Sequence, residues 1–393
     1  MPLRSVPPPS PPANLPAGAA GFFTDLAADL PSSNAATVVI THLLPGQMEF
    51  LPALDRVTSV AAVLPKPKSA DQRTLASVAG AYRCDPLNRG RFADPAWLAA
   101  YLDDRAGGRP LVLADIGGYF APALAEVCAA RPGLIAGIVE DTENGLRRYQ
   151  ELPHLPCPVY TVARSPLKEP EDRLVGEAIV FSIESLLRRL GEVLPGRQAC
   201  VLGFGKIGAG VASALHARHV RVTVIDTDPV RQAQAISLGY GWARTADAIT
   251  GADLVVSATG SRAIGMPHLE LLRDGAVLAG ATSSDDEFDL AGLHTPGSGF
   301  TGVDVIPGVA RYSRAGRSFL LLGGGNAVNF LHTSALGPAI HLIKAEIIAA
   351  AARLATEAHE PGLHEVPGPV RARIAAAWVE AFQRTSTIGK ATR

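Results

Sequence analysis

The stretch QACVLGFGKIGAGVASALHARHVRVTVIDTD, residues 198–228, decides the expected fold. It opens with an apolar run at 199–202 that is long enough for a buried strand. A helical pattern follows, and a second β-branched run at 220–225 ends at Asp226. Between the first run and the helical pattern stand three glycines at G-x-G-x-x-G spacing: Gly203, Gly205 and Gly208. This order of strand, glycines, helix, strand and acid predicts a βαβ unit that binds a dinucleotide.

Each part of this unit has a physical task. The first glycine makes a turn that a Cβ would obstruct, the second lets the backbone approach a pyrophosphate, and the third lets the helix pack close to the strand. Unpaired N–H groups at the start of the helix attract the phosphates. A carboxylate at Asp226 would accept hydrogen bonds from an adenosine ribose and repel a phosphorylated one, so we expect NAD rather than NADP. The alternative is a glycine-rich turn without a ligand.

Composition excludes several classes of partner. The 393 residues suffice for two or three domains, and 36 basic against 37 acidic residues give a formal net charge of −1. No basic patch with interleaved aromatic residues occurs, so neither nucleic acid nor an anionic membrane is an expected partner. No apolar run reaches the roughly 18 residues that span a bilayer. The expected partner is a small molecule.

The cysteines and the N-terminal segment indicate the compartment. Four dispersed cysteines without a C-x-x-C pair predict neither a disulfide scaffold nor a zinc site, and ten dispersed histidines without H-E-x-x-H predict no other metal site. Residues 1–20 begin with a proline-rich run without an apolar centre, so they are expected to be a disordered extension rather than a secretory signal. The predicted location is the cytoplasm.

Short apolar runs alternate with helical patterns on both sides of the dinucleotide unit. Five runs upstream predict strands, at 36–41, 59–64, 110–115, 134–141 and 158–163, and three more downstream, at 253–260, 275–282 and 318–325. Alternating strands and helices are typical of a doubly wound parallel sheet. We therefore expect an α/β protein in which an NAD-binding Rossmann domain, 177–330, is inserted into a second doubly wound α/β substrate domain, formed by 21–176 and the helical return at 331–393.

Ligands in such sheets bind beyond the carboxyl ends of the strands. Polar residues that follow the predicted strands are therefore the first candidates for a site. They are His42, Asp115 with Gly117 and Gly118, Glu140 to Asn144, and Arg164 to Asp172.

At this point the chain resembles the S-adenosyl-L-homocysteine hydrolase family over roughly residues 36–350. In the dinucleotide unit the similar segments are GFGKIGAG, VIDTDPVRQAQAISLGY, VSATG, DGAVLAG, DEFDLAGL and NAVNF; upstream they are ADIGG, GIVEDTENGLRRYQEL and VARSPLKEPEDRLVG. Matches in both predicted domains are more specific than the glycine motif alone. The resemblance implies the family's fold, a tightly held NAD and a homo-oligomer, either a dimer or a tetramer.

The resemblance also implies a reaction. In that family NAD oxidises the 3′-hydroxyl of a nucleoside, which acidifies the C4′ proton so that a 5′ group is eliminated; water then adds and the hydride returns. Lys168 and Asp172 fall on the lysine and aspartate beside the oxidised hydroxyl, although an i,i+4 surface ion pair is the alternative. His42 falls on a histidine near the 5′ position.

The same comparison implies the residues that contact the ligands. Substrate contacts are assigned to Asp115, Glu140 and Asp141, and to His332 as a replacement for a loop histidine. Asp141 is also counted as catalytic, with Lys168, Asp172 and His42. Cofactor contacts are assigned to Gly203, Gly205, Lys206, Ile207, Gly208, Asp226, Thr227, Ala258, Thr259, Gly260 and Asn329, together with Thr142, Glu143 and Asn144 from the other domain.

The departures lie on the substrate side. Asp141 is one methylene shorter than the family's glutamate, Ile116 stands where the family has the aspartate thought to act at C4′, and Ser283 stands where it has a histidine. Residues 335–338 replace a G-H-P loop. The cofactor side and the Lys168–Asp172 pair are kept, while leaving-group and base recognition are rewritten.

Three functions fit this pattern. The preferred hypothesis is an NAD-dependent adenosylhomocysteinase-like enzyme that transiently oxidises a sugar hydroxyl of a nucleoside-like substrate. The oxidation would drive elimination, dehydration or epimerisation, and NAD would be regenerated within the cycle. The alternatives are a true S-adenosylhomocysteine hydrolase and a non-catalytic NAD-binding regulator. The substrate and the fate of its 5′ group stay open.

Overall fold

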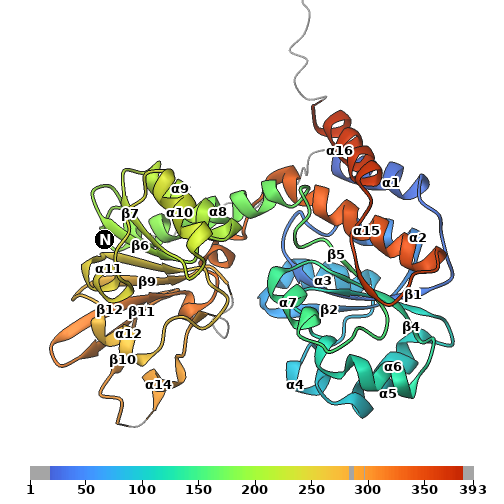
Figure 1. Ribbon diagram of the computed structural model, residues 1–393, viewed down its shortest axis with the longest axis horizontal. Coiled ribbons are helices and arrows are strands. Elements are labelled where there is room, and N and C mark those ends of the chain that lie inside the picture. The colour runs from blue at the N-terminus through green and yellow to red at the C-terminus, as the bar shows by residue number, and fades with distance from the viewer. Residues whose placement is uncertain (1–17, 283–286, 296, 384–393) are drawn as a thin grey trace, which may run out of the picture. The chain divides into compact units, whose positions relative to one another are not determined.

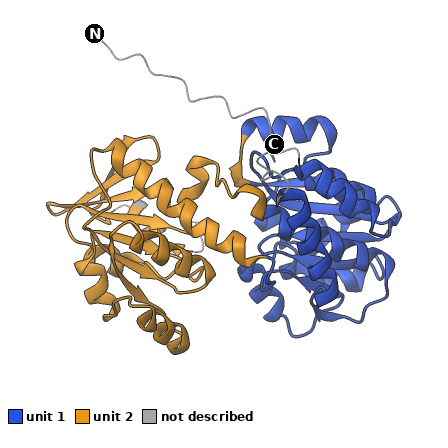
Figure 2. Ribbon diagram, turned by 90° about the horizontal axis from the view of Figure 1, so that it is seen from above, with its two compact units in different colours: residues 1–66, 72–167, 340–393 blue, residues 67–71, 168–339 orange. Residues whose placement is uncertain are grey.

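The computed structural model describes residues 18–282, 287–295 and 297–383. These residues form two compact units (Figure 2). Within the described residues, unit 1 comprises 18–66, 72–167 and 340–383, and unit 2 comprises 67–71 and 168–339. The chain builds part of one α/β unit, then the whole of the other, and then returns, so the predicted α/β fold with an inserted domain is confirmed.

The changes of unit at 167/168 and 339/340 lie nine residues outside the expected boundaries at 176/177 and 330/331. The first expected boundary falls inside a continuous helix, α8 (Glu169–Arg189). Apolar periodicity does not reveal the start of this helix, because its first turn is polar. That turn contains Pro170 and three acidic residues, which are favourable at the start of a helix. The expected N-terminal extension lies outside the described residues as far as residue 17, whereas residues 18–20 already belong to a helix.

Unit 1 contains a six-stranded sheet in the order β13-β5-β4-β3-β1-β2. Its strands are β1 (Ala36–Leu43), β2 (Ser59–Ala70), β3 (Leu111–Asp115), β4 (Ile135–Glu140), β5 (Pro158–Thr161) and β13 (Gly362–His364). Strands β1, β3, β4, β5 and β13 pair in parallel. All five upstream strands expected from the sequence are present, and β13 adds an edge strand within the segment 331–393 that was expected to be helical.

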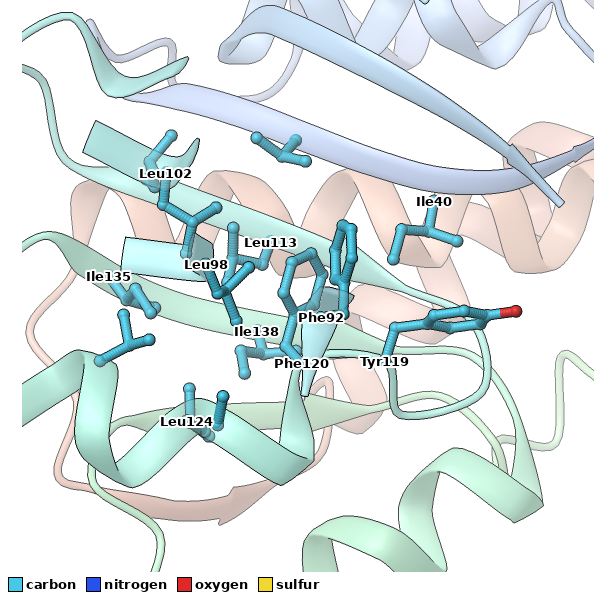
Figure 3. Packing of buried hydrophobic residues seen from close by; sticks show 14 of the residues in the cluster. Ile40, Phe92, Leu98, Leu102, Leu113, Tyr119, Phe120, Leu124, Ile135 and Ile138 are labelled. Carbon is cyan, nitrogen blue, oxygen red and sulfur yellow. The ribbon is translucent and has the colours of Figure 1, made fainter. Parts of the chain in front are cut away.

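Helices cover both faces of this sheet (Figure 1). They are α1 (Gly18–Ala28), α2 (Phe50–Val57), α3 (Gln72–Ala81), α4 (Arg89–Phe92), α5 (Pro95–Ala106), α6 (Leu124–Ala130), α7 (Glu143–Gln150), α15 (Ile340–Thr356) and α16 (Gly368–Gln383). On one face, apolar side chains of α5 and α6 pack on the strands. Figure 3 shows Leu98 and Leu124 beside Leu113 and Ile138 of the sheet, with Tyr119 at the rim of the cluster.

Local signals set the ends of these helices. Asp94 accepts hydrogen bonds from the N–H groups of Ala96 and Trp97 at the start of α5, and Gly107 ends the helix in the left-handed region at φ 55°. Thr142 caps α7 by accepting from the N–H of Gly145 at 3.0 Å. Such caps fix where each helix begins and ends.

Unit 2 contains a seven-stranded sheet in the order β10-β11-β12-β9-β8-β6-β7. Its strands are β6 (Gln198–Leu202), β7 (Arg221–Ile225), β8 (Leu254–Ser257), β9 (Ala276–Gly280), β10 (Thr301–Ile306), β11 (Val309–Arg314) and β12 (Arg317–Leu322). The neighbouring strands β12, β9, β8, β6 and β7 pair in parallel. This is the predicted Rossmann arrangement.

The β10–β11 hairpin is an antiparallel addition that the sequence did not suggest. Its turn is Pro307-Gly308, with Gly308 at φ 83°. The first strand of the hairpin is exposed along nearly its whole length, so it lacks the apolar alternation by which strands are recognised.

Helices also cover both faces of the unit 2 sheet. They are α8, α9 (Lys206–His216), α10 (Pro229–Ser237), α11 (Thr245–Gly251), α12 (Met266–Leu271) and α14 (Ala291–His294). One apolar cluster joins α8 and α9 to one face, and a second joins α11 and α12 to the other. Both predicted doubly wound sheets are therefore present.

Candidate functional site

The first candidate site lies at the switch point of the unit 2 sheet. Strand β6 stands between β7 and β8, so the chain turns to one side after β6 and to the other side after β7. At such a point the loops that follow two adjacent strands separate and leave a crevice for a ligand. Here they are the glycine turn that starts at Gly203 and the turn that starts at Ala258.

The glycines of this turn have different surroundings. Gly203 has φ 91°, and a Cβ there would lie 2.6 Å from the carbonyl oxygen of Ala258. A Cβ on Gly208 would lie 2.0 Å from the carbonyl oxygen of Gly203. A Cβ on Gly205 would meet only the Arg231 side chain, at 3.4 Å. The turn is therefore closed by backbone at Gly203 and Gly208 and open at Gly205, as the approach of a pyrophosphate requires.

The acid at the end of β7 is held beside this turn. Asp226 accepts hydrogen bonds from the N–H of Phe204 at 2.6 Å and from the N–H of Asp228 at 2.8 Å. An ionised carboxylate has about four acceptor positions, so half-buried Asp226 retains capacity for ribose hydroxyls. Thr227, the next residue, is exposed, and Ile207 is half-buried in the first turn of α9.

A buried glutamate that sequence reasoning did not assign holds the second loop. Glu287 has no exposed surface and accepts from the N–H groups of Thr259 and Gly260, each at 3.0 Å. It also accepts from the hydroxyls of Ser257, Thr259 and Thr282 at 2.6–3.1 Å. The sequence indicated only that the segment DEFDLAGL resembles the family. No local spacing rule predicts that Glu287 binds the loop after β8.

Asn329 offers a third feature of this site. Its side chain is 3% exposed, and its Nδ2 donates to Ser334 Oγ at 2.7 Å. Its Oδ1 is buried and has no hydrogen-bond partner among the residues that the structure describes. Because a buried acceptor is usually paired, this atom is suited to a donor from a bound group.

Helix α8 places further side chains beside the cofactor helix. A Cβ on Gly176 would lie 2.5 Å from the backbone of Gly210, so α8 and α9 meet backbone to backbone. This crossing brings Asp172 Oδ2 to 3.4 Å from the Nζ of Lys206, the first residue of α9. Asp172 is therefore fixed next to the start of the phosphate-binding helix.

Lys168 stands just before α8 and is also buried, with 8% of its surface exposed. Its Nζ donates to Glu171 Oε2 at 3.0 Å. The structure pairs Lys168 with Glu171 and Asp172 with Lys206, and the joint role of Lys168 and Asp172 stays a prediction. All four groups belong to unit 2, the unit with the glycine turn.

The second candidate site lies at the switch point of the unit 1 sheet, where β1 stands between β2 and β3. A pocket opens there beyond the ends of β1, β3 and β4. Its polar lining consists of Thr41, Asp115, Asp141 and Lys344, and its apolar lining includes Phe50 and Ile116.

Asp141 and Lys344 form the charged pair of this pocket. Lys344 Nζ lies 3.8 Å from Asp141 Oδ2, and both side chains are 6% exposed. The Nζ also lies 5.0 Å from the centroid of the Phe50 ring. Lys344 was not predicted, because it sits in an alanine-rich helix, α15, that the sequence presents only as buried.

Asp115 and Glu140 occupy positions beneath the loop after β3. Asp115 accepts from the N–H groups of Ile116, Tyr119 and Phe120 and from the Tyr149 hydroxyl at 2.6–3.2 Å. Glu140 accepts from the N–H groups of Gly117, Gly118 and Thr142 and from the Thr142 hydroxyl at 2.7–3.0 Å. With 2% and 0% exposure, both side chains accept hydrogen bonds from the loop itself, and their contact with a substrate stays a prediction.

Burial dominates the proton affinity of these two acids. It raises the pKa of Asp115, against the hydrogen bonds from Tyr149 and from three N–H groups. Burial and, second, the charge of Asp115 raise the pKa of Glu140 to about 8, while hydrogen bonds from Thr142 and Gly117 act in the opposite direction.

The remaining predicted residues have other surroundings. His42 lies near the end of β1 and is half-buried. Glu143 pairs with Arg164 at 2.7 Å, and Asn144 is half-buried in the first turn of α7; with Thr142 they belong to unit 1.

His332 packs against α8. Its Nε2 lies 3.2 Å from Ser185 Oγ, and its ring meets that of Phe181 edge-on at 5.7 Å. Burial, followed by the charge of Arg189, lowers the pKa of His332. Ile116 lines the pocket of unit 1 as an apolar residue, and Ser283 lies outside the described residues.

The dinucleotide region matches a known family. Residues 179–335 match the family model for the S-adenosyl-L-homocysteine hydrolase NAD-binding domain. The residues around Gly205, Asp226 and Asn329 fit NAD, because they combine an open phosphate turn, a carboxylate at the ribose position and an unpaired buried amide oxygen. The cofactor is NAD.

Solved structures of dehydrogenases align with part of the chain at low identity. The phosphoglycerate oxidoreductase of Vibrio cholerae o395 is 14% identical, with 65% of this chain and 78% of that chain covered and a TM-score of 0.37. A glyoxylate reductase of Paecilomyes thermophila is 12% identical (66% and 76% covered, TM-score 0.37). Salmonella D-lactate dehydrogenase is 13% identical (65% and 73% covered, TM-score 0.37). These values carry no weight on activity. Among the described residues, no helix is long and apolar enough to cross a membrane.

Proposed function

Because the chain is related to the S-adenosyl-L-homocysteine hydrolase family through its NAD-binding domain, we propose that it is an enzyme acting on a sugar hydroxyl of a nucleoside-like substrate. Transient oxidation of that hydroxyl, of the 3′ type, drives elimination, dehydration or epimerisation at the neighbouring carbon, and NAD is regenerated in the same cycle. The supporting observation is that buried Lys168 and Asp172 lie at the start of α8, with Asp172 joined to Lys206 of the cofactor helix.

Bound NAD supplies a hydride acceptor for the carbon that bears the hydroxyl. The protein must then remove the hydroxyl proton. Lys168 Nζ and Glu171 Oε2, 3.0 Å apart, can pass a proton between them, and the amine so released can take the proton of the substrate hydroxyl. Asp172 is a positioning residue in this proposal, because its contact with Lys206 fixes the start of α8 against α9.

The pocket of unit 1 has polar groups of its own, Thr41, Asp115, Asp141 and Lys344. Ile116 has no acid–base group, so the C4′ proton needs another acceptor. Asp141, 4% exposed and 3.8 Å from Lys344, is the carboxylate of that pocket with a cation beside it. Asp115 and Glu140 hold the loop that carries Ile116 and thereby fix the wall of the pocket.

The first experiment incubates the purified protein with adenosine, S-adenosylhomocysteine and a panel of nucleosides while absorbance at 340 nm and product masses are recorded. We expect transient NADH, followed by loss of water or by an isomer of equal mass. Release of homocysteine would instead indicate a true hydrolase. Absence of NADH with every compound, despite bound NAD, would indicate a regulator and overturn the proposal.

A pair of variants tests the residue assignment. Lys168→Met should retain NAD and lose hydride exchange by about 10²–10⁴-fold, the usual contribution of a positioned proton acceptor. Arg188→Gln is the matched control, because it removes an exposed cation from the other end of α8. Equal activity of Lys168→Met and the unmodified protein would contradict the role of Lys168.

A further inference from the structure

A guanidinium stands over the open side of the glycine turn in unit 2. Arg231 lies in the first turn of α10, and its Nη1 would lie 3.4 Å from a Cβ built on Gly205. Among the described residues this nitrogen is the group that such a Cβ would meet, whereas a Cβ on Gly203 or Gly208 would first meet backbone. Arg231 therefore faces the side of the turn on which a pyrophosphate approaches.

The start of α10 is fixed beside this turn. Asp228 caps the helix with its side chain. Gln232 accepts a hydrogen bond from the N–H of Asp226 at 2.9 Å and donates one to the carbonyl oxygen of Val224 at 3.1 Å. Because these bonds hold the first turn of α10 against the end of β7, the backbone of Arg231 has a defined place from which its side chain reaches the glycine turn.

Arg231 keeps most of its hydrogen-bond donors for a ligand. Among the described residues its guanidinium makes one ion pair, with Asp228, and no hydrogen bond. The Nε and the Oδ2 of this pair are 3.7 Å apart, which is too long for a hydrogen bond. The two side chains are 42% and 48% exposed, so the pair contributes little to stability. An anion of higher charge can therefore replace Asp228 as the partner.

We propose that Arg231 is a cofactor-binding residue, which binds the diphosphate of NAD and slows the release of the cofactor. A guanidinium matches phosphate oxygens through two parallel hydrogen bonds, and it adds a full charge to the N–H groups at the start of α9. Slow release suits a cofactor that is regenerated in each cycle, as in the proposed function. The inference itself needs only NAD as the cofactor.

The first test measures release of NAD. The NAD-loaded full-length protein is mixed with an excess of isotopically labelled NAD, and the exchange is followed by mass spectrometry. We expect Arg231→Gln to release NAD about tenfold faster or more, because hydrogen bonds between charged groups are lost. Arg221→Gln is the matched control. It removes the same charge from the opposite end of β7, where Arg221 donates to the carbonyl oxygen of Gly196 at 3.3 Å, and should change the rate less than twofold.

The second test identifies the part of the cofactor that Arg231 contacts. Adenosine, ADP, ADP-ribose and NADP each compete with labelled NAD for the protein. Arg231→Gln should weaken ADP and ADP-ribose by about tenfold and adenosine by less than twofold, because adenosine carries no phosphate. A loss confined to NADP would place the guanidinium at a 2′-phosphate and overturn the proposal. An equal loss for adenosine would indicate a general disturbance of the site and would also overturn it.

The third test concerns the exchange of partners. Asp228→Asn removes the competing charge and keeps the helix cap, because Asn caps a helix as well as Asp does. We expect it to slow the release of NAD by about two- to fivefold, and we expect no such effect when Arg231→Gln is also present. The urea midpoint should stay unchanged in both single variants, because both side chains are exposed.

Two results would contradict this exchange. They are an unchanged release rate in Arg231→Gln, and an effect of Asp228→Asn that persists without Arg231. None of the three tests needs a substrate, so failure of the proposal and failure of the proposed function remain distinguishable.

Discussion

The two sheets hold their ligand loops by the same device. In unit 2, Glu287 accepts hydrogen bonds from the backbone of Thr259 and Gly260; in unit 1, Glu140 accepts from the backbone of Gly117 and Gly118. Each glutamate is fully buried and binds the loop after a strand at the switch point of its sheet. Each of these acid side chains joins several N–H groups of one glycine-containing loop and so limits the conformations that the loop can adopt.

The difference lies in what each loop presents. In unit 2 the adjacent glycine turn presents backbone atoms to a ligand, and no other backbone lies close to it at Gly205. In unit 1 the loop borders a pocket with two charged side chains, Asp141 and Lys344. A backbone cradle leaves little room for substitution, whereas side chains can change one at a time. This difference supports the prediction from the sequence that cofactor recognition is kept while substrate recognition is rewritten.

The largest effect is expected from a substitution that disrupts the glycine turn at residues 203–208. Gly208→Ala places a Cβ 2.0 Å from the carbonyl oxygen of Gly203, and neither backbone segment can move without opening the turn. We expect a loss of about 3 kcal/mol in the free energy of unfolding of unit 2 and at least about 100-fold in NAD affinity. Urea denaturation and fluorescence titration with NAD measure the two quantities.

Two other glycines serve as controls for this prediction. Gly205→Ala should keep the stability, because only the Arg231 side chain lies near, and should still lose NAD affinity. Gly251→Ala, at the end of α11 with no atom within 4 Å of the new Cβ, should change neither. Equal stability losses at 205 and 208 would contradict the difference between the open and closed sides of the turn.

The next effect removes one of the two loop anchors. Glu287→Gln turns an acceptor into a donor that faces the N–H groups of Thr259 and Gly260. We expect a loss of about 2–4 kcal/mol in stability and about tenfold in NAD affinity. Glu270→Gln, which breaks only an exposed pair with Arg314, should stay within about 0.5 kcal/mol. If the two variants behave alike, the anchor is not needed for the loop.

The other anchor predicts a dependence on pH. Burial raises the pKa of Glu140 to about 8, above its ordinary value of 4.5, so the folded state holds a proton that the unfolded state releases between these values. The stability from this group is complete below pH 4.5 and falls as the pH rises to about 8. Glu140→Gln should therefore flatten the fall in urea midpoint between pH 5 and pH 9.

Tryptophan fluorescence can follow this change in unit 1 alone. Trp97 lies in unit 1, stacked on Tyr101 at 5.2 Å, so a background with Trp242→Phe and Trp378→Phe leaves one reporter. An unchanged slope in Glu140→Gln would show that the acid under this loop does not titrate with folding.

The sequence predicted those parts of the molecule that depend on local order. The spacing from Gly203 to Asp226 specifies a strand, a turn and a helix, and the structure places Asp226 against the turn through Phe204. The alternation of apolar runs specified both sheets. It failed at the β10 hairpin, because an exposed edge strand has no apolar face to reveal it.

The sequence could not predict pairs that only packing creates. Lys344 meets Asp141 because α15 packs on β4, and Glu287 meets Thr259 through a loop of irregular form. It also could not tell a carboxylate that binds a ligand from one that binds its own loop. Asp115 is predicted to contact the substrate, and in the structure it accepts hydrogen bonds from the N–H groups of Ile116, Tyr119 and Phe120, an arrangement that no sequence pattern reveals.

The smallest expected effect concerns Asn329 and tests whether unit 2 also recognises its cofactor by a side chain. Asn329 Oδ1 is buried without a partner, so Asn329→Ala removes an unsatisfied acceptor together with the bond from Nδ2 to Ser334. In the free protein, removal of the unsatisfied acceptor is stabilising and loss of the bond to Ser334 is destabilising. We therefore expect the free energy of unfolding to change by less than about 1 kcal/mol. If NAD donates to Oδ1, its affinity should fall by about three- to tenfold. Ser334→Ala removes the same internal bond and leaves Oδ1 in place, so it should retain the affinity. Equal losses of NAD affinity in the two variants would mean that the internal bond matters rather than the unpaired oxygen, and that Asn329 does not contact the cofactor.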